Sequence, residues 1–113
     1  MEFSKDNSKI IEELQLAEHN LQGIIGQKQM FQVEMQEVEN ALKELGETKD
    51  EVYKILSGIM IKTDKQELIK ELEERKKIID LRIGTMEKQE DIFKEKSEKL
   101  KEKLSGTLGR RAE

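Results

Sequence analysis

The chain has no cysteine and no proline among its 113 residues, and aromatic side chains make up only 4% of it. The absence of cysteine excludes disulfides, thiolate metal sites and cysteine nucleophiles. The absence of proline leaves nothing to interrupt a long helix from within. Charged residues reach 41%, so there is too little apolar bulk for an ordinary globular core. This composition suits a coiled coil, whose core is a narrow apolar seam.

Long hydrophobic runs are also missing. No stretch approaches the roughly 20 apolar residues that a membrane span needs, and the first residues have no apolar segment typical of a signal peptide. The 21 basic and 25 acidic residues are intermixed and give a net charge of −4, whereas duplex-binding proteins usually have a clustered basic face. We therefore expect a cytoplasmic protein with neither a membrane nor a nucleic-acid partner.

One basic run near the carboxyl end favours nucleic acid only weakly. Its basic residues are Lys94, Lys96, Lys99, Lys101, Lys103, Arg110 and Arg111. Three glutamates, Glu95, Glu98 and Glu102, alternate with the lysines. Such alternation is typical of a solvated helix face rather than of a phosphate-binding surface.

Residues that could carry chemistry are few. The single histidine, His19, falls at the outermost heptad position, and metal sites need several convergent ligands. Gly23 and Gly26 lie inside a heptad pattern and do not follow a strand, so they do not form a phosphate-binding loop. Carboxylates are plentiful, but a coiled coil has no cleft to desolvate them. We expect no enzymatic activity, no cofactor and no metal site.

Heptads starting at Asn7 predict a long first helix over residues 7–45. The a positions are Asn7, Leu14, Leu21, Lys28, Met35 and Leu42, and the d positions are Ile10, Ala17, Ile24, Phe31, Val38 and Leu45. Nearly all are apolar over six heptads, which is a strong coiled-coil signal. Gly46 follows directly and fits a helix C-cap.

A second helix is predicted over residues 64–104, with Asp64 and Glu67 resembling a capping box. Its d positions are Leu72, Ile79, Met86, Phe93 and Leu100, and its a positions are Ile69, Lys76, Ile83, Glu90, Ser97 and Leu104. The two seams register antiparallel, with Leu14 opposite Leu100 and Leu42 opposite Leu72. The imperfect layers are Ile24–Glu90, Lys28–Met86 and Val38–Lys76, and we expect their charged side chains to reach out to solvent. Gly106 and Gly109 indicate a flexible tail over residues 105–113.

The segment between the helices predicts a β-hairpin over residues 51–62. The centre of the antiparallel register falls within one residue of Ser57-Gly58, a suitable two-residue turn. The flanking residues are rich in β-branched and aromatic types: Val52, Tyr53, Ile55, Leu56, Ile59, Met60 and Ile61. A continuous kinked helix is the less favoured alternative. A lone hairpin leaves its edges unpaired, so these seven residues are predicted to mediate oligomerisation.

Apolar residues also gather at the open end of the predicted coil, where the two termini meet. They are Phe3, Ile10, Ile11, Leu14 and Leu16 on the first helix, and Leu100, Leu104 and Leu108 on the second. Some of these positions lie outside the seam, and terminal layers have packing on one side only. We interpret this set as a candidate surface for binding exposed apolar segments of other proteins, although single exposed apolar residues are normal.

The chain resembles the β-subunit family of archaeal prefoldins. The matching segments are Asp50-Glu51-Val52-Tyr53-Lys54, Ile59-Met60-Ile61-Lys62, Glu71-Leu72-Glu73-Glu74-Arg75, Leu81-Arg82-Ile83 and Met86-Glu87-Lys88-Gln89-Glu90. The short spacer between the helices leaves room for one hairpin, as in β-type rather than α-type subunits. One departure is Ser57-Gly58, since relatives often have Gly followed by a polar residue or Pro.

The resemblance implies a single domain over residues 1–113. Its fold is a mostly α antiparallel two-helix coiled coil, capped by a hairpin that joins an intersubunit β-barrel. It also implies an ATP-independent chaperone that assembles with an α-type prefoldin subunit and with copies of itself into an α2β4-like hexamer. The coil tips hold non-native client proteins and deliver them to a group II chaperonin. The alternative is a structural coiled-coil adaptor that binds no clients.

Overall fold

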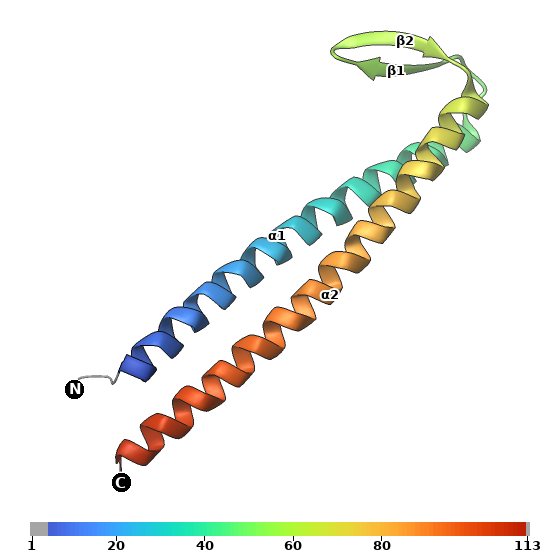
Figure 1. The fold of residues 1–113 in the computed structure, drawn as a ribbon. Helices are drawn as coiled ribbons and strands as arrows, with labels where there is room; N and C mark the ends of the chain where they lie inside the picture. The colour runs from blue at the N-terminus through green and yellow to red at the C-terminus, as the bar shows by residue number, and fades with distance from the viewer. Residues whose placement is uncertain (1–4, 113) are drawn as a thin grey trace. The chain divides into compact units, whose positions relative to one another are not determined.

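The computed structural model describes the backbone of residues 5–112 and the side chains of residues 7–106. Its elements are α1 (Lys5–Glu47), β1 (Val52–Leu56), β2 (Ile59–Thr63) and α2 (Lys65–Ala112), as Figure 1 shows from blue to red. The mostly helical fold predicted from the heptads is confirmed, including the short hairpin between the helices. The kinked-helix alternative is wrong, because β1 and β2 pair as antiparallel strands.

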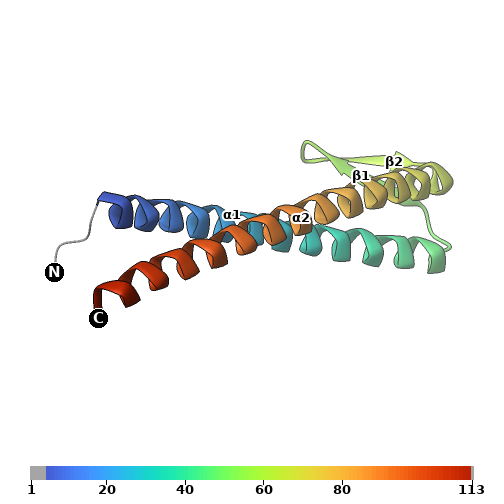
Figure 2. The ribbon, with the colours of Figure 1, turned by 60° about the horizontal axis from the view of Figure 1, so that its bottom comes forward.

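The chain divides into two compact units. Unit 1 comprises Met1–Lys28 and Thr85–Glu113, and unit 2 comprises Gln29–Gly84. In unit 1, segments of α1 and α2 run antiparallel (Figures 1 and 2). Ile10, Ala17 and Leu100 form a buried cluster against which Leu14, Phe93 and Leu104 pack. This cluster agrees with the register predicted for these residues.

Unit 2 contains the other halves of both helices together with the hairpin. Its seam buries Val38, Leu45 and Ile79, which lie at predicted core positions. Glu34 and Arg75 form an ion pair across the two helices. The Arg82 guanidinium lies 5.7 Å from the centre of the Phe31 ring, within cation–π range. The apolar seam and these cross-helix contacts together fix the pairing.

The helices extend further than the sequence predicted. α1 ends at Glu47, so Gly46 lies inside the helix instead of capping it. α2 continues to Ala112, so the prediction of a flexible tail is wrong for the backbone of residues 105–112. Glycine lowers helix propensity by only about 1 kcal/mol, and no proline stops the helix. At the start of α2, the Glu67 amide donates to Asp64 Oδ2 at 3.1 Å, which confirms the predicted N-cap.

The hairpin turns at Ser57 and Gly58, with φ values of 51° and 77°. Positive φ at both central residues is the signature of a type I′ turn, whose twist matches that of paired strands. The register pairs Leu56 with Ile59 and Val52 with Thr63. The predicted turn is therefore confirmed. The serine holds a left-handed conformation that side chains with a Cβ adopt reluctantly.

Two glycine substitutions should have opposite effects. Gly23 lies in the α1 interior with nothing near an added Cβ, so Gly23→Ala should raise the free energy of unfolding by about 1 kcal/mol. Gly58 also has open space, but its positive φ makes Gly58→Ala cost about 1–2 kcal/mol locally. Denaturant unfolding measures the first effect, and amide hydrogen exchange in β1 and β2 measures the second. If the amides of β1 and β2 exchange faster in both variants, or in neither, the conformations assigned to Gly23 and Gly58 are contradicted.

Candidate assembly and client-binding surfaces

The hairpin presents apolar side chains to solvent on both faces. The exposed fractions are 47% for Tyr53, 74% for Ile55, 58% for Leu56, 63% for Ile59, 67% for Met60 and 39% for Ile61. Val52, at the base of the hairpin, is half-buried. All seven residues predicted for oligomerisation thus lie together on this two-stranded sheet. Such a cluster is unusual on a water-facing surface and is typical of an interface.

The strand edges add to this surface. Within the described residues, β1 pairs only with β2, so each strand has one edge without a neighbouring strand. The unpaired amides and carbonyls on these edges can accept strands from other chains. With its exposed apolar faces and open edges, the hairpin can pair with strands of other chains to form a larger sheet.

Polar contacts hold the base of the hairpin in place. Glu51 accepts hydrogen bonds from Lys62 Nζ and from the Tyr53 hydroxyl, both at 2.9 Å. These bonds, that from Lys62 first, lower the pKa of the Glu51 carboxyl. Lys54 Nζ lies 3.5 Å from Glu71 Oε1 and so links β1 to α2. The hairpin is thereby tied to its own unit by its polar groups, while its apolar groups stay exposed.

The predicted client-binding residues have different environments. Ile10 and Leu100 are buried in the core cluster, with Leu14 and Leu104 packed against them. Ile11 is half-buried, and Leu16 is 60% exposed. Phe3 and the Leu108 side chain lie outside the described residues. The structure thus brings four of the predicted residues together in the seam. Ile10 and Leu100 are buried in this cluster, whereas Leu14 and Leu104 are partly exposed.

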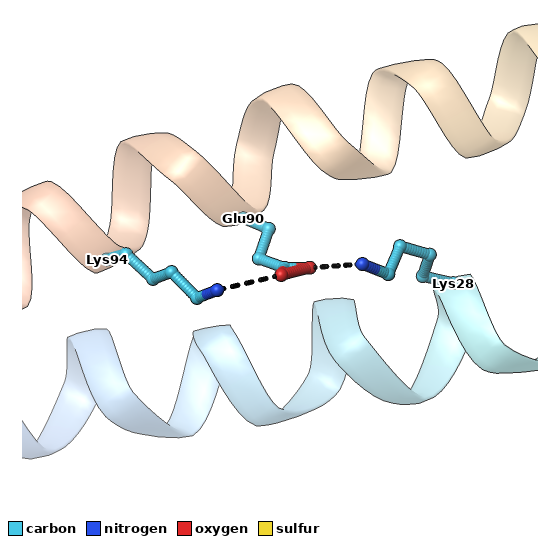
Figure 3. A network of polar contacts seen from close by, with 3 residues as sticks. All are labelled: Lys28, Glu90 and Lys94. Carbon is cyan, nitrogen blue, oxygen red and sulfur yellow. Dashed lines mark hydrogen bonds and ion pairs between the residues drawn. The ribbon is translucent and has the colours of Figure 1, made fainter.

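A charged network crosses the seam of unit 1. Glu90 extends from α2 between two lysines (Figure 3): Lys28 Nζ lies 2.7 Å from its Oε2, and Lys94 Nζ lies 3.1 Å from its Oε1. Glu90 is only 8% exposed. The expectation that Glu90 and Lys28 reach separately into solvent is wrong, because the two charges satisfy each other across the helices. Lys76 behaves as predicted: its side chain is 48% exposed and lies 3.8 Å from Glu39.

The Glu90 network should make stability sensitive to acid. The hydrogen bonds from Lys28 and then Lys94 hold the Glu90 pKa below its ordinary value of 4.5. Because the folded-state pKa is depressed, this stabilisation is present above pH 4.5 and is lost as the pH falls through the folded-state value. We expect Glu90→Gln to lower the unfolding midpoint at pH 7, and the gap from the unsubstituted chain to close in acid. Thermal unfolding from about pH 7 to 3 measures this.

A suitable control is Glu95→Gln, which removes an exposed pair with Lys99 on the same helix. That change should alter stability little at any pH, since exposed ion pairs contribute little. If the difference in unfolding midpoint between Glu90→Gln and the unsubstituted chain does not change with pH, the lost contact is not charge-assisted.

Among the described residues, no group of histidine and carboxylate side chains is arranged to hold a metal ion. His19 is exposed, as its heptad position predicted. Within the same part of the chain, no helix is both long and apolar enough to cross a bilayer.

Comparison with known proteins agrees with this geometry. A family model described as "Prefoldin subunit" matches residues 8–111. The chain belongs to the prefoldin subunit family. It is 33% identical over 105 residues to prefoldin subunit beta of Archaeoglobus fulgidus, covering 91% of this chain and 90% of the relative. It is 34% identical over 99 residues to prefoldin subunit beta of Methanothrix thermoacetophila, covering 86% and 82%.

A solved prefoldin structure has the same fold. The crystal structure of the prefoldin beta subunit from Thermococcus strain KS-1 matches with a TM-score of 0.85 and 28% identity. The match covers 95% of this chain and 96% of the other. The sequence-based resemblance to archaeal prefoldin β subunits is therefore confirmed. Prefoldin subunits are chaperone subunits that form hetero-oligomers with one another.

Sequence reasoning missed one group of exposed apolar residues on the prefoldin helices. They are Met30, Val33, Ile78, Leu81 and Ile92. All fall at heptad positions c or f, and Leu16 shares position c. None lies at b or e. A scan of the outer heptad positions for apolar residues could have found this asymmetry.

Proposed function

We propose that this chain is a subunit of an ATP-independent holdase chaperone. In this proposal, it assembles with an α-type prefoldin subunit and with copies of itself into an α2β4-like hexamer. The hairpins combine into a β-barrel body, and the helix pairs extend from it. The tip, meaning residues 1–16 together with 100–113, captures non-native proteins and delivers them to a group II chaperonin in the cytoplasm.

The observation that carries the proposal is the exposed hairpin surface on a chain of this family. Tyr53, Ile55, Leu56, Ile59, Met60 and Ile61 are all exposed on strands with open edges. Burying an apolar side chain contributes roughly 1.5–3 kcal/mol, so joining several hairpins yields a large driving force. A structural adaptor that dimerises through its helices would have no use for this surface, since its contacts would lie along the coil.

Mixing this chain with an α-type prefoldin subunit tests the proposal. We expect a discrete hetero-oligomer, measured by native mass spectrometry, that suppresses the aggregation of a chemically unfolded protein without ATP. The unmixed chain, measured in parallel, shows whether the partner is required. A dimer held by its helices and without effect on aggregation would favour the adaptor.

A further inference from the structure

Lys65 joins the two ends of the segment that carries the hairpin. Its Nζ donates a hydrogen bond of 2.9 Å to the backbone carbonyl of Thr48, 17 residues earlier in the chain. Thr48 directly follows α1 and Lys65 is the first residue of α2, so this bond connects the chain before β1 to the chain after β2. Both residues are half-buried, whereas their neighbours in the chain are exposed. Water therefore competes less for this bond than for one on the open surface.

The position of Lys65 is unfavourable for its own helix. The N-terminal end of a helix carries partial positive charge, so α2 alone favours a carboxylate there and not an ammonium group. The C-terminal end of α1 carries partial negative charge, and its last turn, residues 44–47, contains no basic side chain. Lys65 supplies the cation that this end of α1 lacks. A residue that breaks a local rule is expected to have a role elsewhere in the fold, and here that role is the bond to Thr48.

Local hydrogen bonds hold both partners of this link. The Thr48 amide donates to the Glu44 carbonyl at 2.9 Å, and the Asp50 amide donates to Thr48 Oγ1 at 3.2 Å. On the other side, the Asp64 N-cap determines where α2, and therefore Lys65, begins. The link thus joins two points that are already fixed, and it restricts the connectors on both sides of the hairpin.

The other ion pairs of the hairpin restrict its orientation less. Lys62 and Glu51 lie 2.9 Å apart and join one side of the hairpin to the other, but neither residue lies in a helix. Lys54 lies 3.5 Å from Glu71 of α2, and these two side chains are 35% and 57% exposed. Exposed ion pairs contribute little to stability. The half-buried bond from Lys65 is therefore the main polar link between the base of the hairpin and the ends of the helices.

We propose that Lys65 is a positioning residue for assembly. By binding the Thr48 carbonyl, it holds β1 and β2 in the orientation in which their open edges and apolar side chains meet those of neighbouring subunits. The proposal rests on the proposed hexamer and names a residue on which its formation depends. A hairpin that is already held in one orientation loses less conformational freedom when it pairs, so assembly is tighter.

Removing the ammonium group tests this role. Lys65→Met retains an apolar stem but cannot donate a hydrogen bond. With an α-type prefoldin subunit, we expect half-maximal assembly, measured by native mass spectrometry, to need about a tenfold higher subunit concentration. Lys65→Arg keeps a charged donor and should recover most of the affinity. Lys70→Met removes the same charge from an exposed position on α2 and should change the affinity less than about twofold. Equal assembly of Lys65→Met and the unsubstituted chain would overturn the proposal.

A distance measurement separates positioning from a loss of stability. Because the chain has no cysteine, Met60→Cys with Glu74→Cys places one spin label on β2 and one on α2, both at exposed positions of unit 2. Double electron–electron resonance on the labelled chain, diluted with unlabelled chain, gives the distribution of distances between the labels. Lys65→Met should broaden this distribution while far-ultraviolet circular dichroism stays nearly unchanged, and Lys70→Met should not broaden it. Weaker assembly of Lys65→Met with an unchanged distribution would also overturn the proposal.

The unsubstituted chain shows whether the role of Lys65 or the proposed function fails. If this chain assembles with the α-type subunit and Lys65→Met assembles equally well, the role of Lys65 fails and the proposed function stands. If the unsubstituted chain does not assemble, the proposed function fails. The distance distributions of the unmixed chains then still decide whether Lys65 holds the hairpin.

Discussion

Replacing Ile59 and Ile61 with lysine is expected to dissociate the oligomer while leaving the helices folded. These side chains are 63% and 39% exposed in the single chain, so lysine costs the isolated hairpin little. In an assembled barrel the same positions would be buried. Each substitution would then lose roughly 1.5–3 kcal/mol of apolar burial and add the cost of burying an ammonium group. Native mass spectrometry should show free subunits, with far-ultraviolet circular dichroism nearly unchanged.

The matched control places the same charges on exposed apolar residues of α2. Ile78 and Leu81 are 52% and 73% exposed and lie in unit 2, as the hairpin does. Ile78→Lys with Leu81→Lys should leave the oligomer intact, because neither residue belongs to the hairpin. An intact oligomer after the hairpin substitutions would rule out the hairpin as the assembly surface. Dissociation in both double variants would point to the helices instead.

Deleting residues 1–11 together with 104–113 is expected to abolish suppression of client aggregation and to preserve the oligomer. The deletion removes Ile10 and Leu104 from the core cluster, as well as Ile11. A single tip offers few apolar contacts of roughly 1.5–3 kcal/mol each. When several tips hold one client, the overall affinity of the assembly for that client rises by about 10²–10⁴. Trimming every tip therefore removes this increase in affinity. Light scattering of an aggregating client measures the loss.

Two single substitutions separate the tip from general surface hydrophobicity. Leu16, in the tip, and Val33, in unit 2, both lie on α1 and are both 60% exposed. Leu16→Ser should weaken client protection, and Val33→Ser should leave it unchanged.

The deletion has its own contradicting outcome. If the assembly that lacks residues 1–11 and 104–113 protects clients as well as the full-length one, the tip is not the binding site.

Periodicity and turn chemistry were enough to predict most of the fold. The seam from Ile10 to Leu45 follows from the heptads, and the hairpin register follows from Ser57-Gly58. The helix ends were less predictable. Gly106 lowers the helix propensity only slightly, so it ends a helix only where a capping contact favours that end. The Lys28–Glu90 pair was missed because the layer analysis compares residues directly opposite each other, whereas long side chains also reach diagonally.

The assembly and client residues were predicted to different depths. The oligomerisation residues of the hairpin could be predicted from the sequence because short exposed β-rich segments have few other roles. The tip set mixed seam and surface residues: the heptads place Ile10 in the seam and Leu16 outside it, as the structure does, but they do not give the exposed fraction of each side chain. Burial depends on how closely two helices approach, which sequence spacing does not specify.

The partly buried Lys28–Glu90 pair also bears on how the chain avoids folding incorrectly. A repetitive seam tolerates sliding by one heptad, because leucine and isoleucine accept many apolar neighbours. A slip in one direction would place Glu90 opposite Ala17 and Lys28 opposite Ile79, about 16 Å apart along the helices, so each charge would lose its partner. An unpaired buried charge is costly, whereas the native alignment pairs both charges at 2.7 Å. We infer that the pair favours the native alignment over this slip while the chain folds.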